Sequence, residues 1–422
     1  MKLAVVGGGS TYTPELIDGI ARLTGDIKIT ELVLADPDAE RLAVVGPFSA
    51  RIMARYGHPA KLWWTSDLDA AVDGAGAVLI QLRVGGQATR HRDETWPLEC
   101  GCIGQETTGA GGFAKALRTV AVVLDVAERV RQRALPDAWI IDFTNPVGIV
   151  TRALLDAGHR AIGLCNVAIG YQRLFAEMLD VAPDRVALDH VGLNHLTWER
   201  AAYLDGADRL PGLLDAHGEE IAAHTGQPLA VTRLAGGAVP SYYLRYFWAH
   251  DTVVEEERGR ETRAQAVAEI ERQLLEMYAD EALDTKPELL THRGGAYYSE
   301  AAVALLASLV TDAGDRQVVN VRNNGTLPFL SDQAVIEVSA TVGAGGAEPV
   351  AVEPVSPLMS GLIAHVSGYE ELAVDAALNG GRDRIARAML AHPLIGQYDL
   401  AEQLTDRLLA ENAQFLAWTA RQ

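Results

Sequence analysis

Short apolar runs alternate with helical periodicity over the first part of the chain. The runs cover residues 2–6, 31–35, 62–65, 77–82, 139–143 and 161–164. Between them apolar residues recur at helical spacing, for example at Leu117, Val120 and Leu124. Strands that are apolar along their whole length are typical of a parallel sheet with helices on both faces. The pattern therefore predicts an α/β domain with repeated βαβ order.

The first apolar run leads into a glycine turn, and the second ends at an acid. Residues 7–9 are all glycine, and Pro14 fits the first turn of a following helix. The glycines alone are as compatible with a plain tight turn as with a dinucleotide site, because Tyr12 replaces the third glycine of the G-x-G-x-x-G motif. Asp36, however, is placed to hydrogen-bond an adenosine ribose and to disfavour a 2′-phosphate. We therefore expect a Rossmann-type site for NAD, formed by Gly7, Gly9, Ser10, Thr11 and Asp36.

Further polar residues follow the ends of the later runs. Arg83, Asn145, Cys165 and Asn166 come after them. In a parallel sheet the ligand crevice lies beyond the carboxyl ends of the strands, so we expect these residues to line the crevice of the glycine turn. The Cys165 thiolate and the imidazole of His195 would suit a borderline divalent metal. By themselves the two residues are better explained as a buried thiol and a core histidine, and only the rest of the chain favours the metal site.

The segments 83–94 and 104–112 are rich in glycine and charge. Glu106 lies in the second segment and is either a functional carboxylate or a solvated loop acid. Arg83, Arg90 and Arg92 are either an anion clamp or ordinary surface cations. The pattern leaves both alternatives open.

The regular alternation is lost from about residue 196, without a linker or a repeat. We infer a dinucleotide-binding domain over residues 1–165 and a mixed α+β domain over residues 166–422, for substrate, metal and oligomerisation. Helices are predicted at 261–279, after residue 300 and from residue 356 onward. The aromatic segment 240–248 is explained by packing unless a tyrosine in it is functional.

Composition narrows the partners and the compartment. The 422 residues are 49% hydrophobic and 22% charged, as in an ordinary globular protein. A formal net charge of -20 argues against nucleic acid and against an anionic membrane surface, although a few arginines can still hold a small anion. Three cysteines cannot make a disulfide framework, and neither a signal peptide nor an apolar span is recognisable. We therefore expect a cytoplasmic protein.

Several motifs together resemble the NAD- and manganese-dependent glycosidases of glycoside hydrolase family 4. The resemblance covers nearly the whole chain. The motifs are Gly7-Gly-Gly-Ser-Thr, Ile103-Gly-Gln-Glu-Thr-Thr-Gly, Asp142-Phe-Thr-Asn-Pro-Val-Gly, Gly163-Leu-Cys-Asn, Gly192-Leu-Asn-His, Thr262-Arg-Ala-Gln and Arg293-Gly-Gly. This resemblance implies a lactate/malate-dehydrogenase-like nucleotide domain with a mixed second domain, NAD and Mn as cofactors, and a homo-oligomer, either a dimer or a tetramer.

The resemblance also implies roles for individual residues. Cys165 and His195 would be the metal ligands, and Tyr243 the base, with Tyr242 and Tyr246 as neighbouring alternatives. Glu106 stands at the position associated with raising the basicity of that tyrosine. Asn145 and Asn166 would touch the substrate, and Asn166 stands where α-specific relatives carry a catalytic acid, so the general acid is left open. The remaining substrate contacts would come from the segments that carry Arg83, Arg90, Arg263 and Arg293.

In this family the chemistry passes through a redox step. NAD takes a hydride from sugar C3, a base removes the C2 proton, β-elimination expels the aglycone, and water adds before the hydride returns. The segment Cys165-Asn-Val-Ala resembles the corresponding motif of the 6-phospho-β-glucosidase branch, which carries Pro where this chain has Ala168. We therefore expect a phosphorylated β-glucoside as substrate. The alternatives are a relative acting on α-linked or non-phosphorylated glycosides, a hydroxy-acid dehydrogenase, and a sensor without chemistry.

Overall fold

The computed structural model describes residues 1–22, 27–295, 297–416 and 418, and its first half is a parallel sheet. The strand order is β3-β2-β1-β4-β5-β6, and every neighbouring pair in this half is parallel. The strands are β1 (Lys2–Val6), β2 (Glu31–Ala35), β3 (Lys61–Thr65), β4 (Ala77–Ile80), β5 (Trp139–Asp142) and β6 (Ala161–Gly163). All six predicted runs are therefore strands, and the predicted parallel sheet is confirmed.

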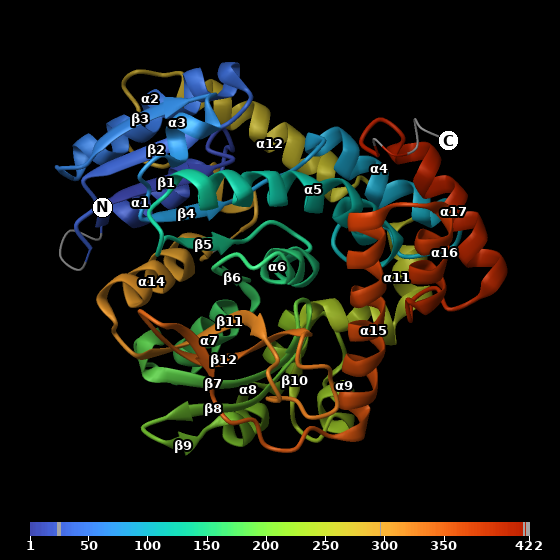
Figure 1. Ribbon diagram of the computed structural model, residues 1–422. Helices are drawn as coiled ribbons and strands as arrows, with labels where there is room; N and C mark the ends of the chain where they lie inside the picture. The colour runs from blue at the N-terminus through green and yellow to red at the C-terminus, as the bar shows by residue number, and fades with distance from the viewer. Residues whose placement is uncertain (23–26, 296, 417, 419–422) are drawn as a thin grey trace.

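Helices cover both faces of this parallel half, as its apolar strands require. They are α1 (Thr13–Arg22), α2 (Ala39–Arg55), α3 (Leu68–Val72), α4 (Gly86–Glu99), α5 (Gly109–Arg133) and α6 (Val147–Asp156). Figure 1 shows α5 as a long helix running across the sheet. Pro14 lies in the first turn of α1, as predicted from the missing N–H.

The sheet does not end at β6 but continues into an antiparallel half. Asn320 of β11 pairs with Gly163, and the order continues β12-β7-β8-β10, with β13 and β9 beside β12 and β8. These strands are β7 (Val186–Leu193), β8 (Leu196–Leu204), β9 (Ala207–Asp208), β10 (Val239–Pro240), β11 (Asp315–Arg322), β12 (Val335–Gly343) and β13 (Gly346–Pro349). The predicted mixed second domain is confirmed. The boundary at residue 165 and the homo-oligomer stay predictions.

Helices of the second half pack around this sheet and back onto the first half. They are α7 (Val167–Met178), α8 (Leu210–Thr225), α9 (Leu229–Leu234), α10 (Arg245–Trp248), α11 (His250–Glu257), α12 (Arg263–Tyr278), α13 (Leu289–His292), α14 (Tyr298–Thr311), α15 (Pro357–Asn379), α16 (Arg382–Ala391) and α17 (Tyr398–Asn412), with short 3₁₀ turns η1 (Pro183–Arg185) and η2 (Tyr242–Leu244). α12 contacts α2 and α4, and α15 contacts α5 and α6 (Figure 1). The three predicted helical regions are confirmed. Within the described residues no helix has the length and apolarity to cross a bilayer.

Candidate functional site

Two cavities lie side by side at the carboxyl ends of the parallel strands. The larger one, of about 610 Å³, adjoins the glycine turn and is lined by Gly7, Asp36 and Arg41. The smaller one, of about 290 Å³, is lined by Asn145, Asn166 and His195. Five residues line both cavities, so the two cavities adjoin; they are Ser10, Gln81, Leu82, Arg83 and Arg293. Of the strand-end residues predicted to share one crevice, Asp36, Arg83, Asn145 and Asn166 line these cavities, whereas Cys165 lines a separate cavity of about 530 Å³.

The larger cavity has the features of a dinucleotide site. Gly7 has φ +89°, and a side chain on it would collide with the Gln81 carbonyl. Asp36 accepts hydrogen bonds from the N–H groups of Gly9 and Asp38, at 3.0 Å each, and burial raises the pKa of Asp36. The backbone can therefore approach a pyrophosphate while a carboxylate at the end of β2 faces the ribose position. The residues present thus fit NAD.

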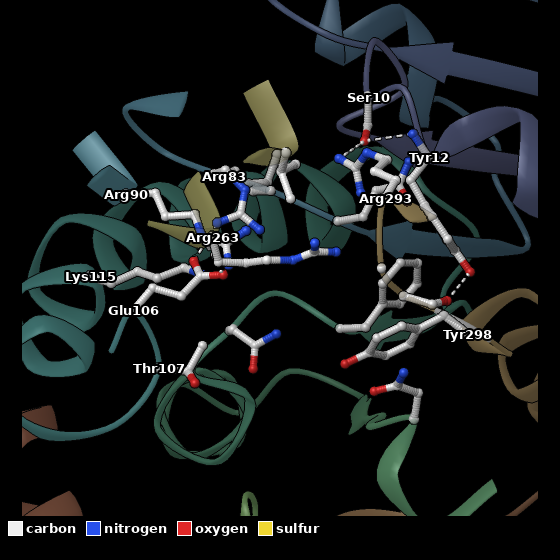
Figure 2. Close-up of a pocket in the computed structure, with 18 of the residues that line it drawn as sticks. Ser10, Tyr12, Arg83, Arg90, Glu106, Thr107, Lys115, Arg263, Arg293 and Tyr298 are labelled. Carbon is white, nitrogen blue, oxygen red and sulfur yellow. Dashed lines mark hydrogen bonds and ion pairs between the residues drawn. The ribbon is translucent and has the colours of Figure 1, made fainter. Parts of the chain in front are cut away.

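Glu106 lies between three cations on the wall of the smaller cavity. Its carboxylate binds Lys115 at 2.7 Å, Arg90 at 3.1 Å and also Arg83 (Figure 2). Burial alone would raise the pKa of Glu106, but these cations hold it well below its usual range. The side chain is 7% exposed, so the alternative of a solvated loop acid is wrong.

Tyr243 and His195 form a stacked pair beside this cluster. Their ring centroids are 3.7 Å apart, and their planes differ by 5°. Burial lowers the pKa of His195 to about 4, which leaves a neutral imidazole that can ligate a metal. Burial raises the pKa of Tyr243 well above its ordinary value; Cys165, Tyr246 and Glu106 add to this, and Arg90 opposes it. In the protein alone, Tyr243 is therefore a protonated phenol.

Cys165 and His195, the two predicted metal ligands, are both buried. Cys165 follows β6, and burial and the charge of Glu337 raise the pKa of its thiol. Nδ1 of His195 and Oδ1 of Asn145 are buried without a hydrogen-bond partner, as expected of atoms that await a ligand. No group of three or more His, Cys, Asp or Glu suited to a metal occurs among the described residues. A metal at Cys165 and His195 would therefore keep positions for substrate oxygens, which fits a catalytic ion.

The four predicted substrate arginines all line the smaller cavity, but they differ in their partners. Arg83 and Arg90 bind Glu106, and Arg90 also binds Glu94 at 2.7 Å. Arg263 donates to the His292 carbonyl at 2.8 Å, and no ion pair forms at Arg263 within the described part of the chain. Arg263 is therefore the cation that is most available to an anionic ligand.

Arg293 faces the nucleotide side of the crevice instead. It donates to Thr11 Oγ1 at 2.6 Å and to Ser10 Oγ at 3.3 Å, and it pairs with Glu271 at 2.9 Å. Figure 2 shows Arg293 beside Ser10, on the opposite side of the cavity from Glu106. Its predicted contact with the substrate stays a prediction.

Sequence reasoning missed Lys115 and Tyr298. Lys115 is 2% exposed and lies in the first, fully buried turns of α5. Lys115 is the one charged residue in the stretch 109–117, and this was a usable signal. A lysine buried in an apolar helix is rarely unpaired, so the pattern indicated a buried acidic partner. Tyr298 of α14 lines the smaller cavity, and no local pattern in the sequence singles it out. One alternative was that the aromatic residues of segment 240–248 serve only in packing. This is true of Tyr246, which is 4% exposed, but Tyr243 lines the smaller cavity.

Comparison with known proteins agrees with this geometry. A model described as family 4 glycosyl hydrolase matches residues 2–181, and one for the C-terminal domain of that family matches residues 190–395. The chain is 36% identical to a probable 6-phospho-beta-glucosidase of Bacillus subtilis over 99% of this chain and 97% of the relative. It is 33% identical to the 6-phospho-beta-glucosidase of Escherichia coli over 99% of this chain and 96% of that relative.

Solved structures give the same result. The 6-phospho-beta glucosidase of Thermotoga maritima, determined with manganese, NAD+ and glucose-6-phosphate, superposes with a TM-score of 0.92 at 33% identity, over 98% of this chain and 99% of that one. A malate dehydrogenase of Salinibacter ruber, at 17% identity and a TM-score of 0.55 over 91% of this chain and 99% of that one, shares the fold alone. The predicted lactate/malate-dehydrogenase-like architecture is thus confirmed, and the chain belongs to the family 4 glycosyl hydrolases.

Proposed function

We propose that this protein hydrolyses 6-phospho-β-glucosides with NAD and manganese. The observation that carries the proposal is the position of Arg263, which forms no ion pair with the described residues, in the same cavity as Tyr243 and His195. A dianionic sugar phosphate needs such a group, because the chain as a whole has a net charge of -20. The names of the B. subtilis, E. coli and T. maritima relatives support the same substrate class.

The two cofactors would be held by different walls of the crevice. Gly7, Ser10 and Asp36 line the larger cavity and would hold NAD together with Gly9 and Thr11 of the same turn. Cys165 with His195 would hold the divalent metal. When bound, NAD would supply a reversible hydride acceptor for sugar C3, and the metal a Lewis acid for the C2 and C3 oxygens. Since Asp36 disfavours a 2′-phosphate, we expect NAD to bind more tightly than NADP.

Tyr243 would remove the proton from C2 once C3 is oxidised. Loss of that proton lets the C1–O bond break by β-elimination, and water then adds at C1 before C3 is reduced again. The pKa of Tyr243 is raised by burial and by Cys165, so the phenolate needs a nearby positive charge. Arg90 is a cation of this chain that acts in that direction, and a divalent ion at His195 would add to it.

Glu106 would act on Tyr243 through the cations that it holds. A carboxylate beside a phenol raises its pKa, and Glu106 does so here, but the same carboxylate fixes Arg90 and Lys115 at the cavity wall. Asn166 begins α7 and faces the cavity, where it would bind the sugar. An amide cannot protonate the leaving oxygen, so a bound water is the simplest proton donor for that step.

A panel of chromogenic β-glucosides tests the substrate class. With NAD and manganese, the 6-phosphate should be hydrolysed and the free glycoside should not, without net formation of NADH. Arg263→Met should lower kcat/KM for the 6-phosphate by about 30- to 150-fold, because a charge-assisted hydrogen bond is worth roughly 2–3 kcal/mol. Equal hydrolysis of both glycosides, or stoichiometric NADH, would refute the proposal.

Solvent exchange tests the route and its base. Product formed in D₂O should carry deuterium at C2, whereas direct displacement at C1 leaves C2 untouched. Tyr243→Phe keeps the ring that stacks on His195, so it should lose about 10²–10⁴ in rate while NAD binding is nearly unchanged. Normal deuterium entry in this variant would assign the proton to another base, and Tyr242 would be tested next.

A further inference from the structure

A buried polar network lies behind the proposed metal ligands, in the antiparallel half of the sheet. Its centre is Glu337 of β12, a fully buried residue. Glu337 accepts three hydrogen bonds: from His190 Nε2 at 3.1 Å, from Asn194 Nδ2 at 3.0 Å and from Asn320 Nδ2 at 2.9 Å. Three segments of the second half therefore meet at one carboxylate: β7 with the turn that follows it, β11 and β12.

The network continues away from the site through His190. The other ring nitrogen, Nδ1, lies 2.6 Å from Glu199 Oε1 in β8. Burial alone would lower the pKa of His190, but Glu199 and Glu337 together raise it to about 10. An imidazolium between two carboxylates leaves one net negative charge inside the protein. A buried arrangement of this kind seldom adds net stability over an apolar one, so its presence calls for another explanation.

Asn194 connects this network to the turn that carries His195. Its amide donates a hydrogen bond to Glu337 at 3.0 Å. It is the chain neighbour of His195 in the tight β7–β8 connection, where Leu193 pairs with Leu196. His195 has φ +64°, a left-handed conformation that non-glycine residues rarely adopt. Surrounding contacts must hold such a conformation, and the Asn194–Glu337 hydrogen bond is one of them.

We propose that Glu337 is a positioning residue of the metal site. Through Asn194 it fixes the turn that carries His195, and its buried negative charge favours a divalent cation nearby. Glu337 acts through Asn194 and not as a ligand, since both of its carboxylate oxygens already accept hydrogen bonds within the network. The inference rests on the proposed metal dependence and goes beyond it in assigning the residues that support the ligands.

Glu337→Gln is the direct test, and Glu199→Gln is its matched control. Glutamine has one acceptor oxygen, so it cannot accept from His190 and from both amides as Glu337 does. Glu199 is equally buried and contacts the same imidazole, but it does not contact Asn194. We expect manganese to bind about 10- to 100-fold more weakly to Glu337→Gln, as is typical when a supporting partner of a metal ligand is lost. Glu199→Gln should bind manganese nearly as the wild type does.

Manganese binding is measured by titration calorimetry on the metal-free protein with NAD present. Cobalt(II) gives a second readout, because its near-ultraviolet thiolate charge-transfer band reports the Cys165–metal bond directly. This band should weaken or shift in Glu337→Gln and persist in Glu199→Gln. A merely structural role for Glu337 would change both variants alike.

Asn194→Ala provides the variant that is needed if Glu337→Gln does not fold. It should weaken manganese binding by a similar factor, and the double variant should be no weaker than the single ones, because both changes break one connection. Unchanged manganese affinity in Glu337→Gln and Asn194→Ala, with the wild type binding manganese, would overturn this inference alone. A wild-type protein that binds no manganese would overturn the proposed function as well.

Discussion

Two buried charge clusters flank His195, and they have opposite composition. On the α4–α5 side, one carboxylate, Glu106, is surrounded by Arg83, Arg90 and Lys115. On the side of the antiparallel sheet, the single imidazole of His190 lies between Glu199 and Glu337. The first cluster carries an excess of positive charge and the second an excess of negative charge. The charges of Glu337, Lys115 and Glu106 all affect the pKa of His195.

The sign of each excess matches what its side of the site has to bind. Cations on the cavity wall suit an anionic substrate and a phenolate at Tyr243, while carboxylates behind Cys165 suit a divalent metal. The net charge of -20 could not reveal this division, because it sums over the whole surface. The comparison indicates that the two clusters have different roles. Changing one cluster at a time tests this difference.

The largest expected effect comes from removing the shared carboxylate of the positive cluster. Glu106→Gln leaves Lys115, which is 2% exposed, and its neighbouring arginines without their common counter-ion. Breaking a buried pair in this way lowers the free energy of unfolding by about 3–5 kcal/mol. Urea denaturation measures it. The partly exposed pair of Glu402 with Arg382 gives the control, since Glu402→Gln should cost about 0–1 kcal/mol. An equal loss of unfolding free energy in Glu106→Gln and Glu402→Gln would refute the special role of the buried cluster.

The negative cluster should show itself in the pH dependence of stability. The pKa of His190 is raised from 6.5 to about 10 in the folded protein, with burial opposing and Glu199 and Glu337 causing the rise. Its contribution is therefore complete below pH 6.5 and is lost as the pH rises toward about 10. Over this window the free energy of unfolding of the wild type should fall, relative to that of His190→Gln, by up to about 1.4 kcal/mol per pH unit. Denaturation midpoints of both proteins across the window measure the difference, and parallel curves would mean that His190 is neutral.

The parallel half of the molecule could be predicted from the sequence far better than these clusters. Apolar strand periodicity and the rule that ligands lie at strand ends placed Asp36, Asn145 and Asn166 correctly, because each of these residues lies within three positions of the end of its strand. The family resemblance pointed to Tyr243 and Glu106, both of which line the smaller cavity.

The antiparallel half offered no comparable signal. His190 and Glu337 are 147 residues apart in the chain, and their contact depends on β12 pairing with β7. An isolated glutamate in an apolar strand is, in the sequence, indistinguishable from one that faces solvent. Contacts of this range follow from the topology of the folded sheet and not from local spacing.

Lys115 should give the smallest of these effects, with a sign opposite to that of His190. Burial lowers its pKa from 10.5 to about 8, Glu106 opposes this, and Arg83 and Arg90 add to it. Between these two values the unfolded chain binds one proton more than the folded protein, so wild-type stability should rise with pH relative to Lys115→Met, by up to about 1.4 kcal/mol per pH unit. The same denaturation series, extended to pH 10.5, measures it. Lys286, whose pKa is raised by Glu15 against the effect of burial, is the matched control, because Lys286→Met should show no such relative gain. Parallel curves for the wild type and Lys115→Met would show that the positive cluster keeps all its protons, and the two clusters would then no longer differ in their response to pH.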